Sequence, residues 1–268
     1  MKSQALTLPN MGVLQSKVPP KLWKKIKEVC VDNRCDHTAD YHDKLAGLIK
    51  DEYAVEDKEI ILGLRDHTAA LIEEYYSIHG YAQPNMGCYT WTADIWQRTK
   101  TPLPSYQTMM MPDRNGHVGH WQETATWVNY QKKGEMNPIH NHTADFSIVV
   151  FCKIPYDFEE EKEYLAPTAQ PDESLRYIVK DSDFKNMITY NQNGNFGFNY
   201  SMLHGVSGTG TLNLDQSYEG TMLLFPGSLM HFVYPFYTSD EERITISANY
   251  KLMRGKPAEI QALQSKYD

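Results

Sequence analysis

Three histidines stand in two short segments whose residue types could bind a metal ion. His140 and His142 lie two residues apart in GEMNPIHNHTADFS (134–147), and His231 lies in LLFPGSLMHFVYPF (223–236). Residues two apart in a β-strand point to the same face, so both imidazoles of the first segment can converge on one point. A solvent-facing strand with two polar side chains would have the same spacing, and this pair alone does not separate the two interpretations.

His231 favours the metal site. It follows the apolar run GTMLLF and the pair Pro226-Gly227, so the sequence places it where a strand leaves a tight turn. Alone it could be a surface loop residue, but several aromatic residues surround it: Phe232, Tyr234 and Phe236. Imidazoles from two strands and a turn can build an open metal site that keeps free positions for a substrate. We therefore predict that the three histidines are the metal ligands.

A row of hydrogen-bonding side chains follows in ERITISANY (242–250). Strand alternation puts Arg243, Thr245 and Ser247 on one face and apolar residues on the other. If the polar face is buried, Arg243 needs an anion, and a carboxylate bound through two hydrogen bonds, with a further one from Thr245, is its natural partner. The alternative is an exposed strand on which Arg243 pairs with an adjacent glutamate, which stabilises little. The adjacent glutamates are Glu241 and Glu242.

The spacing between the two segments suits one cavity. Twelve residues separate His231 from Arg243, enough for a turn and the start of an adjacent antiparallel strand. This places the guanidinium deeper in the cavity than the metal. We expect a ligand with a chelating end and a distal carboxylate.

Composition bounds the class of protein. The chain has 268 residues and a formal net charge of −8, which argues against a broad phosphate-binding surface and against nucleic acid as a partner. No stretch approaches a membrane span, and the N-terminus lacks the apolar run of a secretory signal. The four cysteines show no CxxC spacing, which predicts reduced thiols in a cytoplasmic protein. They are Cys30, Cys35, Cys88 and Cys152.

The elements that must position these residues are predicted as one domain over 1–268. Apolar stripes at helical spacing predict an N-terminal helical layer over 18–85, the second of them formed by Tyr41, Leu45, Leu48 and Ile49. β-Branched and aromatic runs predict an antiparallel β sandwich or barrel over 86–255, with a polar excursion at 156–190 and a tail at 256–268. The predicted strands lie in TATWVNYQKK, DFSIVVFCKIP, NFGFNYS, GTMLLF and ERITISANYKL.

The two histidine segments carry a family resemblance. NPIHNHTADFSIVVFCKIP and GTMLLFPGSLMHFVYPFYTSDEERITISAN resemble the 2-oxoglutarate/Fe(II)-dependent oxygenases of bacteria and marine phages, over roughly 125–250. The resemblance implies a double-stranded β-helix that holds Fe(II), with His140, His142 and His231 as its ligands. It also implies that Arg243 and Thr245 hold the 5-carboxylate of 2-oxoglutarate, the cosubstrate used with O2, and that Asn129 faces the cosubstrate.

One residue departs from the wider oxygenase superfamily, which favours two histidines and a carboxylate as ligands. His142 stands where that pattern has an acidic residue, and Asp145 is the only carboxylate close by in sequence. On a regular strand Asp145 would point away from the pair, although a turn or bulge could bring it in. We predict a three-histidine site and keep Asp145 as the alternative ligand.

The same segments also resemble cupins, which share the double-stranded β-helix. A cupin metalloenzyme that does not use 2-oxoglutarate is therefore a second hypothesis, and a non-catalytic binding module with incidental histidines is a third. Arg243 and Thr245 have an assigned role only in the oxygenase, so we predict an Fe(II)- and 2-oxoglutarate-dependent hydroxylase. Its prime substrate stays open between a small molecule and a protein side chain, and neither the oligomeric state nor the metal used in the cell follows from the sequence.

Overall fold

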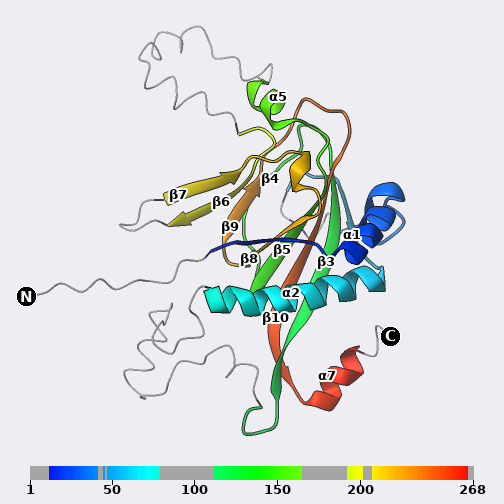
Figure 1. Cartoon of the computed structure of the whole chain (residues 1–268), viewed down its shortest axis with the longest axis vertical. Helices are drawn as coiled ribbons and strands as arrows, with labels where there is room; N and C mark the ends of the chain where they lie inside the picture. The colour runs from blue at the N-terminus through cyan, green and yellow to red at the C-terminus, as the bar shows by residue number, and fades with distance from the viewer. Residues whose placement is uncertain are drawn as a thin grey trace, which may run out of the picture.

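The strands form two antiparallel sheets (Figure 1). The computed structural model describes residues 12–41, 45, 47–78, 112–164, 192–201 and 207–264. Within them, the larger sheet has the order β1-β8-β5-β10-β3-β2 and the smaller one β4-β9-β6-β7. The larger sheet contains β1 (Leu14–Lys17), β2 (Asp51–Ala54), β3 (Val118–Gln131), β5 (Phe146–Lys153), β8 (Thr221–Pro226) and β10 (Arg243–Gly255). The smaller sheet contains β4 (Asn137–His140), β6 (Phe196–Ser201), β7 (Ser207–Leu212) and β9 (Met230–Val233).

The order of the strands is that of a double-stranded β-helix. From β3 to β10 the chain crosses between the two sheets, and only β6 and β7 are consecutive strands of the same sheet. The crossings bring β3 beside β10 and β4 beside β9, although these strands are far apart in the sequence. The predicted fold class and each of the five predicted strands are therefore confirmed.

The central strands of the larger sheet are covered on both faces. Along β5, Ile148 and Val150 belong to a core beneath the helices, whereas Val149 and Phe151 belong to a core between the sheets. Along β10, Ile246 faces the helical core while Thr245 lines a cavity on the opposite face. Strand alternation, read from the sequence, assigned the two faces of β10 correctly.

Two helical segments cover the outer face of the larger sheet. They are α1 (Pro20–Ile26), continued by the π-helix η1 (Lys27–Asp32), and α2 (Lys58–Ile78), which lies across the sheet in Figure 1. Their buried side chains follow two of the predicted stripes: Leu22, Ile26 and Cys30, and Leu64, Leu71, Ile72 and Tyr75. Among the described helices, none is long and apolar enough to cross a membrane.

The second predicted stripe is wrong. The described residues between 41 and 50 form bends, Leu48 is 64% exposed, and β2 follows at once. The backbone N–H of Tyr41 donates to Glu52 O at 2.8 Å, and that of Leu48 donates to Met136 O at 2.9 Å. These groups therefore bond to distant strands instead of to the preceding helical turn, so the helical layer predicted over 18–85 is interrupted by a strand.

Three short helices complete the described part of the chain. In the excursion, α5 (Phe158–Glu163) opens the segment, and residues 165–191 lie outside the described part of the chain. The predicted tail contains α7 (Pro257–Gln264), and η6 (Gln216–Tyr218) precedes β8. Cys30, Cys35 and Cys152 are free thiols, whereas Cys88 lies outside the described residues.

Ile246 tests the contribution of the helical core to stability. Its side chain is fully buried in the middle of β10, between β3 and β5. Ile246→Ala removes three buried carbons and leaves a cavity, so we expect the free energy of unfolding to fall by about 2–5 kcal/mol. Urea denaturation measures the change. A loss below about 0.5 kcal/mol would mean that this strand is not part of the packed core.

Candidate metal centre

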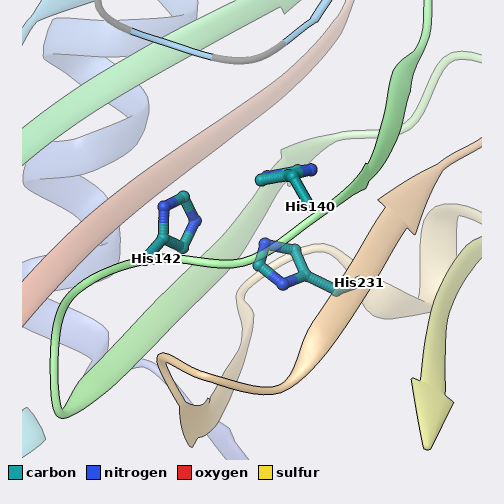
Figure 2. Close-up of side chains that lie close together, drawn as sticks. All are labelled: His140, His142 and His231. Carbon is teal, nitrogen blue, oxygen red and sulfur yellow. The ribbon is translucent and has the colours of Figure 1, made fainter.

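The structure brings His140, His142 and His231 together (Figure 2). One ligand nitrogen from each residue lies within 4.8 Å of those of the other two. The ring centroids are 4.2 Å apart for His140 and His231, 5.0 Å for His142 and His231, and 5.2 Å for His140 and His142. His140 and His231 are opposite residues in the antiparallel pair β4–β9. Three imidazoles at this separation can hold one metal ion.

Two of the imidazoles are oriented by backbone carbonyls. Nδ1 of His140 lies 2.7 Å from Pro138 O, and Nδ1 of His231 lies 2.9 Å from Leu229 O. Because a carbonyl only accepts, Nδ1 carries the proton in both rings, and Nε2 keeps its lone pair. A hydrogen bond on the far nitrogen is the usual way in which proteins orient a metal-binding histidine.

His142 is positioned by a turn, because β4 already ends at His140. The His142 N–H donates to Gly227 O at 2.8 Å, and the Gly227 N–H donates to Asp145 O at 3.0 Å. The His142 ring also meets the edge of Trp127, with centroids 5.8 Å apart. The i, i+2 spacing thus located the pair, but the convergence depends on the loop that follows the strand.

Burial keeps the imidazoles neutral. His231 is 4% exposed and packs against Phe225, and burial with the neighbouring His140 lowers its pKa to about 3. Burial and His140 also lower the pKa of His142 to about 4, and burial lowers the pKa of His140. The neutral ring is the form that binds a metal ion.

Asp145 is not part of the cluster. Its side chain is exposed, and its carboxylate accepts a hydrogen bond from the Leu252 N–H at 2.8 Å. The loop does turn after His142, as the alternative ligand required, but it directs this carboxylate to β10. Among the described residues, the group that could hold a metal contains the three histidines and no carboxylate.

Arg243 is buried, with 1% of its surface exposed, and lines the same cavity as the histidines. Its five N–H groups donate to four neutral residues and to no carboxylate. Nε and Nη2 both donate to Gln131 Oε1, Nη2 also to Tyr234 O, and Nη1 to Gly194 O and the Tyr156 hydroxyl. The exposed-strand alternative is wrong, because Glu241 pairs with Lys153 and Glu242 with Arg34.

The other predicted cosubstrate residues lie on the same wall of the cavity. Asn129 Nδ2 donates to the Thr245 hydroxyl at 3.0 Å, and Asn129 Oδ1 accepts from the indole of Trp127 at 3.1 Å. Because Thr245 accepts from Asn129, its hydroxyl proton remains available for another acceptor. The histidines, Arg243, Thr245 and Asn129 all line one cavity, whose apolar lining includes Phe196, Phe225 and Val233.

Comparison with protein families now identifies the segment that carries this site. Residues 125–249 match the family model described as "Putative 2OG-Fe(II) oxygenase". The match runs from β3 to β10 and contains the three histidines, Asn129 and Arg243. This segment is thus similar to that oxygenase family, over a little less than half of the chain.

The solved structures that resemble this chain share little sequence identity with it. An oxidoreductase of the 2OG-Fe(II) oxygenase family from Burkholderia pseudomallei is 12% identical, over 50% of this chain and 46% of that chain, with a TM-score of 0.31. A prolyl-4-hydroxylase from Pseudomonas putida is 11% identical, over 90% and 92%, with a TM-score of 0.40. Oxalate decarboxylase from Bacillus subtilis is 11% identical, over 73% and 46%, with a TM-score of 0.25. Likenesses this low carry no conclusion about substrate, and no curated protein matches the chain.

The cavity contains one residue that the sequence did not reveal. Glu52, on β2, is 1% exposed and lines the cavity, and its Oε1 has no hydrogen-bond partner. Burial and the nearby carboxylates of Glu135 and Asp40 raise its pKa to about 8. The segment IKDEYAV was predicted to be helical, and a helix does not alternate its side chains between two faces. Read as a strand, the same residues would have placed Asp51 on the outer face and Glu52 on the inner face.

Gly227 tests how the turn positions His142. A Cβ at Gly227 would lie 2.3 Å from Ala144 O, so Gly227→Ala must displace the loop that carries His142. We expect the affinity for Co(II), measured by titration of its visible absorption, to fall at least about tenfold. Gly210→Ala is the matched control, because its Cβ would meet only Tyr200 Cε1 at 3.6 Å. Unchanged affinity in Gly227→Ala would contradict this role for the loop.

Glu52 predicts a pH-dependent stability. Between the ordinary pKa of a glutamate and about 8, the folded state keeps a proton that the unfolded state releases, so the free energy of unfolding falls as pH rises. Glu52→Gln removes this loss, so we expect the variant to gain stability relative to the parent from pH 5 to pH 8, by at most roughly 1.4 kcal/mol per pH unit. Urea denaturation at pH 5, 6.5 and 8 measures it. A difference that does not change with pH would contradict the raised pKa.

Proposed function

We propose that this chain is an Fe(II)- and 2-oxoglutarate-dependent oxygenase, specifically a hydroxylase. One observation carries the proposal: three neutral imidazoles converge in a cavity that also contains the buried guanidinium of Arg243. The match of residues 125–249 to the family model described as "Putative 2OG-Fe(II) oxygenase" supports the same assignment.

The histidines fit Fe(II). Imidazole is a good ligand for iron, and three of them on one side leave other coordination positions for a cosubstrate and O2. His140, His142 and His231 would hold the metal through one nitrogen each. Neutral imidazoles leave the metal charge uncompensated, so a dianionic cosubstrate would contribute strongly to the electrostatics of the site. When bound together, Fe(II), 2-oxoglutarate and O2 supply oxidative decarboxylation coupled to oxidation of a substrate.

Arg243 would bind the distal carboxylate of 2-oxoglutarate. The edge of its guanidinium formed by Nε and Nη2 is now occupied by a single neutral oxygen, Gln131 Oε1. A carboxylate presents two charged oxygens to such an edge and bonds more strongly than an amide does. We infer that Gln131 occupies this edge in the free protein and moves aside when the cosubstrate binds, with the Thr245 hydroxyl as a further donor.

The surrounding side chains would keep water out of the site. Phe225 and Phe196 pack against His231, with ring centroids at 4.9 and 6.1 Å, and both line the cavity. Apolar walls strengthen the interaction between the metal, the cosubstrate and Arg243, because little solvent is left to screen their charges. The two alternatives, a cupin enzyme without 2-oxoglutarate and a module with incidental histidines, assign no role to Arg243.

We also propose that 1–268 forms one domain and that the protein is cytoplasmic. Side chains of α1 and α2 share a core with the larger sheet, which supports the first proposal. The free thiols of Cys30, Cys35 and Cys152 support the second. A small molecule or a protein side chain remains the proposed prime substrate, and the net charge disfavours nucleic acid.

Arg243→Lys tests the cosubstrate site. Lysine keeps the charge but loses the paired donors, so we expect 2-oxoglutarate to bind at least about tenfold more weakly while Fe(II) binds normally. Anaerobic titration of the Fe(II) protein with 2-oxoglutarate, followed by a visible charge-transfer band, measures the affinity. Succinate formation in air measures turnover.

Arg34→Lys is the matched control, because Arg34 pairs with Asp51 and Glu242 away from the cavity. It should bind 2-oxoglutarate as the parent does. If the parent protein shows no charge-transfer band, the oxygenase proposal fails. If Arg243→Lys binds 2-oxoglutarate normally, the role given to Arg243 is wrong.

A further inference from the structure

The cavity has a second ionisable group, Glu52, at the end away from Arg243. In the larger sheet Glu52 on β2 pairs with Asn129 on β3, which pairs with Thr245 on β10. Opposite residues in an antiparallel sheet point to the same face, so the three side chains form one row along the cavity wall. The row spans two strand spacings, about 10 Å. Glu52 stands at the edge of the sheet, and Thr245 stands beside Arg243.

Glu52 is buried without a partner for Oε1 in the part of the chain that the structure describes. Two nearby cations, Arg34 after η1 and Lys132 directly after β3, both bond to Asp51 Oδ2, on the residue next to Glu52. Leaving a buried polar atom unpaired destabilises the folded state, and a ligand that pairs with the atom recovers that free energy. The side chain therefore has the properties of a ligand-binding group that is empty in the free protein.

The charges around Glu52 favour a cation. The carboxylates of Glu135 on the loop after β3 and Asp40 beside β2 act on Glu52, and their negative charge adds to the burial that holds its carboxyl protonated. At the other end of the row, the guanidinium of Arg243 favours an anion, as would a metal ion held by the three imidazoles. The cavity is thus electrostatically polarised, with one end suited to a dianionic cosubstrate and the other to a positively charged group.

We propose that Glu52 binds a cationic nitrogen group of the prime substrate, an ammonium or a guanidinium. The substrate class is then an amine or guanidine, either a small molecule or a basic protein side chain. This assignment of substrate class rests on the proposed oxygenase function, since it concerns what enters the same cavity.

Binding of such a cation has a measurable consequence. The carboxyl of Glu52 gives its proton to the solvent, and the carboxylate that forms pairs with the cation, so binding near pH 7 releases about one proton. Pairing within a buried cavity also discriminates strongly against a neutral analogue of the same shape, which leaves the carboxyl unpaired.

The test compares three probes of matched length: n-butylammonium, 1-butanol and butyrate. They are titrated calorimetrically into the anaerobic Fe(II) protein with 2-oxoglutarate, in two buffers of different ionisation enthalpy. We expect butylammonium to bind at least about tenfold more tightly than butanol and butyrate, with release of about one proton. Equal binding of butylammonium and butanol by the parent protein would overturn the inference, and this comparison needs no variant.

Glu52→Gln should reduce the affinity for butylammonium to that for butanol and abolish proton release. Glu123→Gln is the control: burial also raises the pKa of that carboxyl, but it bonds to Thr126 and does not line the cavity. A preference for the cation that survives in Glu52→Gln would overturn the inference.

The charge-transfer band, recorded on the same samples, separates this inference from the oxygenase proposal. A normal band without a cation preference would reject the role of Glu52 alone. A cation preference without the band would support that role and reject the oxygenase function.

Discussion

The site depends on the register in which β4 pairs with β9. That register places His140 directly opposite His231, and it joins two segments that lie some ninety residues apart in the chain. A shift of one residue would turn one of the two imidazoles to the other face of the sheet. The core between the sheets supports this register, because Phe196 on the neighbouring strand β6 and Phe225 on β8 of the other sheet both pack against the His231 ring. The packing of the core between the sheets and the positions of the metal-binding histidines therefore both depend on the pairing of β4 with β9.

β10 links this centre to the rest of the fold. One face of the strand carries Ile244, Ile246 and Ala248 into the core beneath the helices. The other face turns Arg243 and Thr245 into the cavity. Core packing and the pairing with β3 and β5 therefore hold the backbone of the polar row in place, in addition to the hydrogen bonds that its side chains make.

Two buried ionisable side chains, Arg243 and Glu52, line the cavity, and they differ in the hydrogen-bond partners that surround them. Arg243 makes five hydrogen bonds to four neutral acceptor atoms, which replace the hydration of its guanidinium, whereas Glu52 Oε1 has no partner among the described residues and burial raises the pKa of the Glu52 carboxyl. The first arrangement stabilises a fixed cation, and the second leaves a carboxyl that can ionise when a positive charge arrives. In the oxygenase that we propose, these two groups would sort the cosubstrate and the substrate to opposite ends of one cavity.

The sequence by itself determined the antiparallel β architecture, five of the ten described strands and the three histidines that cluster. Those features follow from local rules: alternation along a strand, the turn at Pro226-Gly227, and the short range of the i, i+2 spacing. Family resemblance added the roles of Arg243, Thr245 and Asn129, for which the structure supplies a shared cavity.

Only the tertiary structure decided which polar groups meet. The carboxylate of Asp145 bonds to Leu252 on β10, Gln131 occupies the edge of Arg243, and Glu52 faces the cavity from an edge strand in a segment predicted to be helical. Each of these outcomes depends on hydrogen bonds between residues far apart in the chain. Local periodicity carries no information about such partners, because pairing between distant strands is set by the packing of the whole sheet.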